Sequence, residues 1–332
     1  MTELRARTRL VLRDTGADTV RGIMLVNACF LLLTIGDVAT IWALPVAGVV
    51  GAMLGRGSIG GLVVVGLALR HRGDGPRGLR RLLPVRLGPV MFRSAVHATA
   101  TVTWYIAWQS SMALADSYAV GYAAPLLMIL LAVPLLGERL GRRRVIATVV
   151  GFLGMLVMLR PGGDLWVPVS LLVLAGVVGM AVSRTMTRML ATTETPECLT
   201  FWLLAFHLPV GLSMLALGFP APGIDATVVV GMLVLGVSNG MAHWLHARAS
   251  ALAPVGALAP YEYVGMIWAG LFGYLFFTQV PSWSTIGGAA LVAAAGIDGF
   301  YREHRRRRAE RALVPGGAIA MAPPAFARHG DL

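Results

Sequence analysis

The sequence has no lysine, only two cysteines and little charge of either sign. Charged residues make up 13% of the 332 residues, whereas an average soluble domain carries about a quarter. Because 57% of the residues are hydrophobic, this composition excludes an ordinary soluble protein. Cys29 lies inside one apolar segment and Cys198 beside another, so we expect two small buried side chains rather than a disulfide framework.

Arginine supplies all 28 basic residues, which with abundant Ala and Gly favours a GC-rich bacterial genome. The formal net charge of +12 could indicate nucleic-acid binding, but arginines placed mostly in loops of an apolar chain follow the positive-inside rule instead. With the N-terminus inside, these arginines fall on the cytoplasmic side: the N-terminal tail, the 70–93 and 139–144 loops, Arg184, Arg188, Arg248 and the C-terminal tail. Only Arg160 falls outside. We therefore expect a multi-pass protein of a bacterial inner membrane with both termini in the cytoplasm and no nucleic-acid partner.

Long apolar runs are the main feature that is present. A bilayer core of roughly 30 Å needs about 20 apolar residues per helix, which these runs supply repeatedly. Taken between charges, Pro and Gly, they predict an all-α polytopic membrane protein of ten transmembrane helices. The expected ranges are 21–43, 47–69, 92–113, 117–137, 144–160, 166–187, 198–218, 227–247, 252–277 and 283–302.

The two halves of the chain resemble each other. Ser111–Ala115 matches Ser250–Ala253, and further on Tyr122 matches Tyr263. Residues 21–162 and 163–302 are thus expected to form two five-helix repeats, between a cytoplasmic tail, 1–20, and a basic, disordered tail, 303–332. Because five is odd, the second repeat enters the membrane in the opposite direction. Inverted repeats of this kind are typical of secondary transporters.

Two stretches resemble the drug/metabolite transporter superfamily, specifically its EamA-type branch of ten-helix transporters. They are Pro125-Leu-Leu-Met-Ile-Leu-Leu-Ala-Val-Pro-Leu-Leu-Gly-Glu-Arg139 in the first half and Ala259-Pro-Tyr-Glu-Tyr263 in the second. The similarity covers roughly residues 20–302, with two departures: Gln279 stands where the second repeat usually has Glu, and no Lys follows Asp37. The resemblance implies export of a metabolite or drug through a central cavity, but it does not name the cargo.

A charge deep within an expected membrane helix is costly and marks a functional candidate, and Asp37, Arg56 and Glu262 are the three candidates of this kind. Asp37 and Arg56 have similar depths in neighbouring antiparallel helices, so they could meet, as a structural ion pair or as cargo-binding groups. Glu262 lies near the midplane with no basic residue near it in sequence. It could exchange a proton, meet an amino group of the cargo, or remain a protonated carboxyl hydrogen-bonded to a neighbouring helix.

Polar and aromatic residues share faces of two further helices. Thr101 and Trp104 lie on one face with His97 and Trp108, while Asn239 and His243 lie on one face with His246. The matching pair Tyr122 and Tyr263 are further candidates for a cavity that binds an amphipathic metabolite. The alternatives are packing or an interfacial belt for the aromatic residues and interhelical hydrogen bonds for the histidines.

The main rival to a transporter is an intramembrane metal-dependent hydrolase that uses His243, His246 and Glu262. His243 and His246 have i, i+3 spacing, but no His-Glu-x-x-His pattern or cysteine ligand cluster accompanies them. The chain also has no Gly-rich phosphate loop that would support a primary pump. We therefore expect a secondary transporter, not an enzyme, with a small-molecule substrate, the lipid bilayer as its surroundings, no metal and no cofactor; a homodimer is left open.

Overall fold

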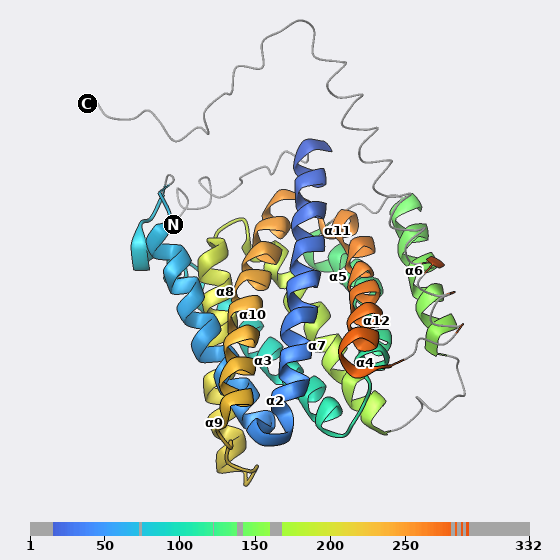
Figure 1. Cartoon of the computed structure of the whole chain (residues 1–332). Helices are drawn as coiled ribbons and strands as arrows, with labels where there is room; N and C mark the ends of the chain where they lie inside the picture. Colours follow the sequence, from blue (N-terminus) through green and yellow to red (C-terminus); the bar gives the residue numbers. More distant parts are fainter. Residues whose placement is uncertain are drawn as a thin grey trace, which may run out of the picture.

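The computed structural model describes residues 16–72, 75–121, 123–137, 142–159 and 168–279, together with residues 283, 287, 290 and 291. Within these residues the chain is helical and forms no strand. The helices stand side by side as one bundle (Figure 1). The expected helix 283–302 and the expected tail 303–332 lie almost entirely outside the described residues.

The first two expected helices form the two arms of one element, α2 (Gly16–Arg70). Gly48 interrupts it with φ 61° and ψ 178°, values that a residue with a Cβ rarely adopts. Pro45 lies just before this point and removes a backbone donor from the helix. As a result the chain reverses, and the second arm runs back along the bundle (Figure 1).

The next elements are the short 3₁₀ helix η1 (Gly78–Leu82) and the helices α3 (Leu87–Gln109), α6 (Arg142–Leu159), α7 (Pro168–Leu190) and α10 (Ala226–Leu252). The four α-helices correspond to four of the expected spans, with ends that differ by several residues. Arg93, at which the expected loop 70–93 and the expected helix 92–113 overlap, is buried in α3. It donates to Thr187 Oγ1 at 2.9 Å and to the Leu199 carbonyl at 2.8 Å.

The expected helices 117–137, 198–218 and 252–277 each correspond to two consecutive helices with a short interruption between them, and Pro196–Ala216 is still long and apolar enough to cross a membrane as one span. The observed pairs are α4 (Leu114–Gly121) with α5 (Ala124–Leu136), α8 (Pro196–Ala205) with α9 (His207–Ala216), and α11 (Val255–Glu262) with α12 (Val264–Phe277). Prolines explain two of the breaks, because Pro125 opens α5 and Pro209 lies in the first turn of α9, each just after its break, whereas Pro260 lies inside α11, three residues before Tyr263. Proline supplies no N–H to the preceding turn and crowds its carbonyls.

Long apolar helices and outward-facing apolar side chains define an all-α membrane protein. By length and composition, α2, α7, α10 and the stretch Pro196–Ala216, which spans α8 and α9, could cross a membrane. Leu62, Leu171, Val230 and Leu275 on these and neighbouring helices are all more than half exposed. In water such exposure would be costly, whereas lipid tails accommodate it.

Small residues bring α10 against the second arm of α2. A Cβ built on Gly236 would lie 2.4 Å from Ile59 Cβ and 3.0 Å from the Gly60 amide nitrogen. A Cβ on Gly240 would lie 3.1 Å from the Gly60 carbonyl oxygen. The spacing Gly236-x-x-x-Gly240 therefore serves close helix packing, as this pattern does in membrane proteins generally.

Gly236→Val is expected to destabilise the protein by about 1–3 kcal/mol, since neither the Ile59 side chain nor the Gly60 backbone can make room without a shift. Unfolding of the detergent-solubilised protein measures the change. Gly66→Val is the matched control on α2, because a Cβ there meets nothing within 4 Å. Equal losses in the two variants would show that the valine acts through helix propensity and not through the α2–α10 contact.

Candidate functional site

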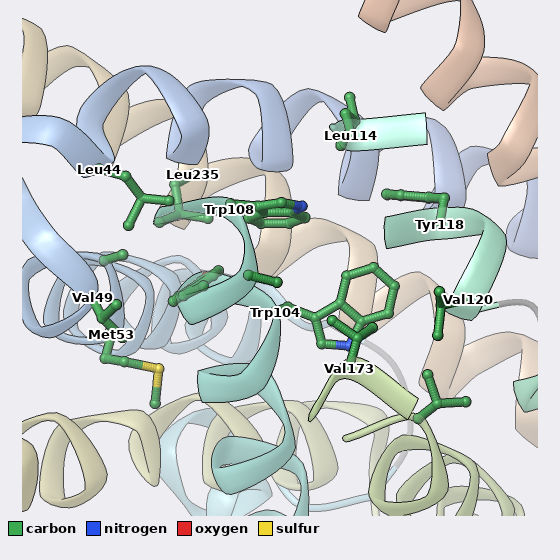
Figure 2. Close-up of a cluster of buried hydrophobic side chains, with 14 of the residues drawn as sticks. Leu44, Val49, Met53, Trp104, Trp108, Leu114, Tyr118, Val120, Val173 and Leu235 are labelled. Atoms are coloured by element: carbon green, nitrogen blue, oxygen red, sulfur yellow. The ribbon is translucent and has the colours of Figure 1, made fainter. Parts of the chain in front are cut away.

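A polar cavity of about 60 Å³ lies inside the bundle, walled by α2, α3, α4, α7 and α10. Its lining residues are Phe30, Leu33, Asp37, Arg56, His97, Thr101, Trp104, Tyr105, Trp108, Tyr118, Met180, Arg184 and His243. Figure 2 shows Trp104 and Trp108 on one helix and Tyr118 on the short helix opposite. The rings of Trp108 and Tyr118 both contact the Trp104 ring edge to face, at centroid distances of 6.0 Å and 5.8 Å.

Asp37 and Arg56 both line this cavity, but no salt bridge joins them. The Tyr118 hydroxyl donates to Asp37 Oδ2 at 2.5 Å. Arg56 donates to the Tyr105 hydroxyl at 3.1 Å, and its Nη2 lies 2.7 Å from His243 Nε2. The two residues therefore share one cavity, and the ion pair expected as one alternative is not formed.

Glu262 is neutralised, contrary to the expectation from sequence. Arg184 of α7 forms a salt bridge with its Oε2, and His246 Nε2 lies 3.6 Å from its Oε1. The Arg184 guanidinium also lies over the Phe30 ring, 5.3 Å from its centroid. Since Glu262 is only 1% exposed, this cation from another helix makes its charge tolerable inside the bundle.

Three histidines surround Arg56 on the far side of the cavity. The His97 ring centroid is 5.1 Å from that of His243 and 5.9 Å from that of His207. His207 Nε2 lies 3.3 Å from Thr101 Oγ1. Within the described part of the chain, neither ring nitrogen of His97 has a hydrogen-bond partner, although the side chain is only 2% exposed. Buried polar atoms without a partner are rare and suit a site that receives a ligand.

The structure gathers most of the residues that the sequence singled out. Seven of them line the cavity: Asp37, Arg56, His97, Thr101, Trp104, Trp108 and His243. Glu262 does not line the cavity itself but forms a salt bridge with Arg184, which does. Tyr122 lies outside the described residues.

Asn239 and Tyr263 are fully buried but are not lining residues of this cavity. Asn239 packs directly on Gly36, where an added Cβ would lie 2.3 Å from its Nδ2. Neither its Nδ2 nor its Oδ1 has a hydrogen-bond partner. Asn239 thus lies in the α2–α10 contact beside Asp37, not across the cavity from it.

Sequence reasoning missed three residues of the site: Tyr105, Tyr118 and Arg184. Arg184 was counted among cytoplasmic arginines, although it falls inside the expected helix 166–187, and that position was the available signal. Tyr105 lies next to Trp104 on α3, one position off the face that was singled out. Tyr118 lies on α4, after the turn that follows α3, and its hydrogen bond to Asp37 is visible only in the folded chain.

The structure does not bring His243, His246 and Glu262 together as the metal site of a hydrolase would require. His243 faces Arg56, while His246 faces Glu262, so the two histidines have different partners. No group of three His, Cys, Asp or Glu side chains suited to a metal occurs among the described residues. Gly236-Val-Ser-Asn-Gly240 has the spacing of a hydrolase nucleophile turn, but it lies inside α10, whereas that motif requires a strand-to-helix turn.

Comparison with known proteins places these features in a family. The chain is 31% identical over 214 residues to the riboflavin transporter of Rhizobium johnstonii, covering 64% of this chain and 70% of that one. It is 26% identical over 186 residues to an S-adenosylmethionine uptake transporter of Rickettsia prowazekii, covering 56% and 63%. It is also 26% identical over 213 residues to a pseudopaline exporter of Pseudomonas aeruginosa, covering 63% and 74%. No family model matches the chain.

A solved crystal structure shares the fold, with a TM-score of 0.70 at 21% identity over 86% of this chain and 98% of the other. Fold, site and relatives together define a multi-pass membrane transporter of the drug/metabolite type. The chain belongs to the family of small-molecule membrane transporters that includes the Rhizobium johnstonii riboflavin transporter. It is a secondary transporter and not an enzyme.

Proposed function

We propose that this protein is an EamA-type transporter that exports a small amphipathic or amino-acid-like metabolite across a bacterial inner membrane by alternating access. In this proposal ten helices form two inverted repeats, 21–162 and 163–302, with both termini in the cytoplasm. The cargo binds in the polar cavity between α2, α3, α4, α7 and α10. Asp37, Arg56, Thr101, Trp104 and His243 contact it directly, and Glu262 acts through Arg184.

The observation that carries the proposal is the small size of a cavity with so many polar groups. About 60 Å³ holds a few water molecules, whereas ligand sites for metabolites have about 300–1,000 Å³. Arg56, His97 and Trp104 nevertheless keep buried polar atoms that have no partner among the described residues. This combination fits a binding site that is too small for a whole metabolite and must widen before cargo can bind.

The broken helices are suited to that opening. α4–α5 and α11–α12 pack against each other, α11 on α5 and α12 on α4, and each pair is interrupted near the middle. Interrupted helices of this kind can bend more easily than continuous ones, because a proline in or beside the interruption leaves out one backbone donor. The break at Tyr263 directly follows Glu262, so bending there would move Glu262 relative to Arg184.

The test is saturable, gradient-driven flux in liposomes that contain the purified protein. Riboflavin and S-adenosylmethionine, the compounds named for two relatives, are the first radiolabelled probes, loaded inside or outside to give the direction. We expect flux of at least one probe that saturates with concentration and collapses when an ionophore removes the ion gradient. Probe movement that rises linearly with concentration and equals that of protein-free liposomes would contradict the proposal.

Pro260→Ala restores a backbone donor inside α11, three residues before the break at Tyr263, and by stiffening this segment is expected to slow flux about tenfold or more, while leaving the protein at least as stable. The flux assay and thermal unfolding of the same preparation measure the two effects. Pro134→Ala is the control, because Pro134 lies inside α5 and away from the break. Equal flux in the Pro260→Ala protein and the unchanged protein would argue against bending at Tyr263.

A further inference from the structure

The connection between α2 and α3 lies at one end of the bundle (Figure 1). After Gly48 the second arm of α2 runs to Arg70, about 33 Å at 1.5 Å per residue, which matches a hydrocarbon core of roughly 30 Å. α3 begins at Leu87 and leads back into the bundle. The residues between these two helices therefore lie where lipid headgroups meet water.

This connection carries a dense positive charge. Residues 70–87 contain six arginines and one acidic residue, Asp74. Arg81 is buried in a salt bridge with Glu197, and the other five arginines are exposed: Arg70, Arg72, Arg77, Arg80 and Arg86. Glu194, the other carboxylate that the connection contacts, is only 6% exposed. The outer face of the connection is therefore strongly basic.

Large apolar side chains lie among these arginines. Leu79, Leu83, Val85 and Leu87 have exposed fractions of 57%, 66%, 77% and 58%. In water four such neighbours would be costly, because each loses the free energy that burial of its apolar surface would give. Cationic groups beside apolar ones are typical of segments that lie in the membrane interface. This face therefore has the composition of a membrane-surface element.

Hydrogen bonds to the start of α8 and the residues before it hold this face outward. Trp202 Nε1 donates to the Leu82 carbonyl at 2.9 Å, and the Leu82 side chain is only 7% exposed. Glu194 accepts from the backbone N–H groups of Val85 and Arg86, at 2.9 Å and 2.8 Å. Because the backbone is fixed on its inner side, the exposed leucines and arginines form a surface that exists before any partner binds.

We propose that this face, formed by the exposed side chains of residues 70–87, is a binding surface for anionic phospholipid. The arginines bind the phosphate groups, and the leucines with Val85 contact the boundary between headgroups and acyl chains. Charge complementarity selects this partner, because an anionic phospholipid joins a negative headgroup to apolar chains, whereas a zwitterionic phospholipid matches only the apolar side chains. None of these residues lines the polar cavity, so lipid binding here is separate from cargo binding.

The preference between two lipids tests the role of charge. Fluorescent phosphatidylglycerol and phosphatidylcholine with the same acyl chains are titrated onto the full-length protein in detergent micelles. Phosphatidylglycerol is expected to bind about tenfold or more tightly at low salt, and about 0.5 M salt should bring the ratio close to one. Equal affinities at low salt overturn the proposal. Displacement of phosphatidylglycerol by millimolar inorganic phosphate also overturns it, because the face would then be a site for free anions.

Paired arginine variants locate the site. Arg77→Gln with Arg80→Gln is expected to lower the ratio of phosphatidylglycerol to phosphatidylcholine affinity about threefold or more. Arg21→Gln with Arg142→Gln is the matched control, because it removes two exposed arginines from α2 and α6 and should leave the ratio unchanged. An equal fall in both pairs would mean that the lipid responds to the total charge of the protein and not to this face.

A paired leucine variant tests the apolar part. Leu79→Ser with Leu83→Ser is expected to weaken both lipids about threefold or more while the ratio stays the same, since the arginines remain. Both side chains are exposed, so thermal unfolding should be unchanged. Leu217→Ser with Ile224→Ser is the control, at two exposed positions in a connection without arginine. A changed oligomeric state with unchanged lipid affinity would make the face a contact between copies and overturn the proposal.

Discussion

Arg184→Gln is expected to lower the free energy of unfolding by about 3–5 kcal/mol, because it leaves the Glu262 carboxylate buried with no full charge beside it. Glu262 is 1% exposed, and its remaining neighbour, His246 Nε2, is 3.6 Å from Oε1. The double variant Arg184→Gln, Glu262→Gln removes both charges and keeps two groups that can hydrogen-bond to each other. We expect it to recover most of the loss.

A double-mutant cycle in detergent micelles measures this coupling, with each single variant, the double variant and the unchanged protein unfolded under one condition. Arg21→Gln is the control, since Arg21 is 73% exposed on its side chain and 4.0 Å from Asp18, and exposed pairs contribute about 0–1 kcal/mol. Losses in the two single variants that simply add up in the double variant would mean that Arg184 and Glu262 do not stabilise each other.

The coupling also bears on transport. In the closed cavity the Arg184–Glu262 pair ties α7 to the end of α11, beside the break at Tyr263. If the pair separates as the cavity opens, Glu262→Gln alone should change the flux of every probe. Unchanged flux, affinity and pH dependence in Glu262→Gln would limit Glu262 to a structural role.

Helix positions were largely predictable from sequence, because hydropathy alone decides which segments can cross lipid. The exact positions of the interruptions within these helices were not predictable from sequence. Pro125, Pro209 and Pro260 each lie inside a run long enough for a full span, and a proline within a membrane helix can cause a kink as well as a complete break. Gly48 illustrates the reverse case: the boundary between 21–43 and 47–69 was predictable, but its reversal depends on a positive φ that the composition does not reveal.

The residues that line the cavity were partly predictable from their burial in apolar helices. The hydrogen-bond and ion-pair partners of these residues were not. Asp37, Arg56 and Trp104 were candidates because charge or indole groups occur inside apolar helices, and all three line the cavity. Which charge faces which depends on helix rotation, for which one sequence gives no measure. Arg184 and Glu262 are 78 residues apart, so the guanidinium that neutralises Glu262 comes from a helix that is distant in the sequence.

A second buried pair, Arg81 with Glu197, lies where the α2–α3 connection meets the start of α8. Arg81 donates to Glu197 Oε2 from Nη2 at 2.8 Å and from Nε at 3.1 Å, while Trp244 Nε1 donates to Oε1 at 3.0 Å. The two charged side chains are 7% and 3% exposed. Nearby, Glu194 accepts from the backbone N–H groups of Val85 and Arg86. These bonds fasten the connection to the bundle.

Glu197→Leu is expected to cost about 3–5 kcal/mol, because it leaves the Arg81 guanidinium and the Trp244 N–H buried without their acceptor. Glu197→Gln keeps an oxygen for Trp244 and should cost less, which makes it the matched control for the charge. Both variants should leave the flux of the riboflavin and S-adenosylmethionine probes unchanged, since neither Arg81 nor Glu197 lines the cavity. Unfolding titrations and the liposome flux assay check the two statements; a changed flux in Glu197→Gln would tie this end of the bundle to transport.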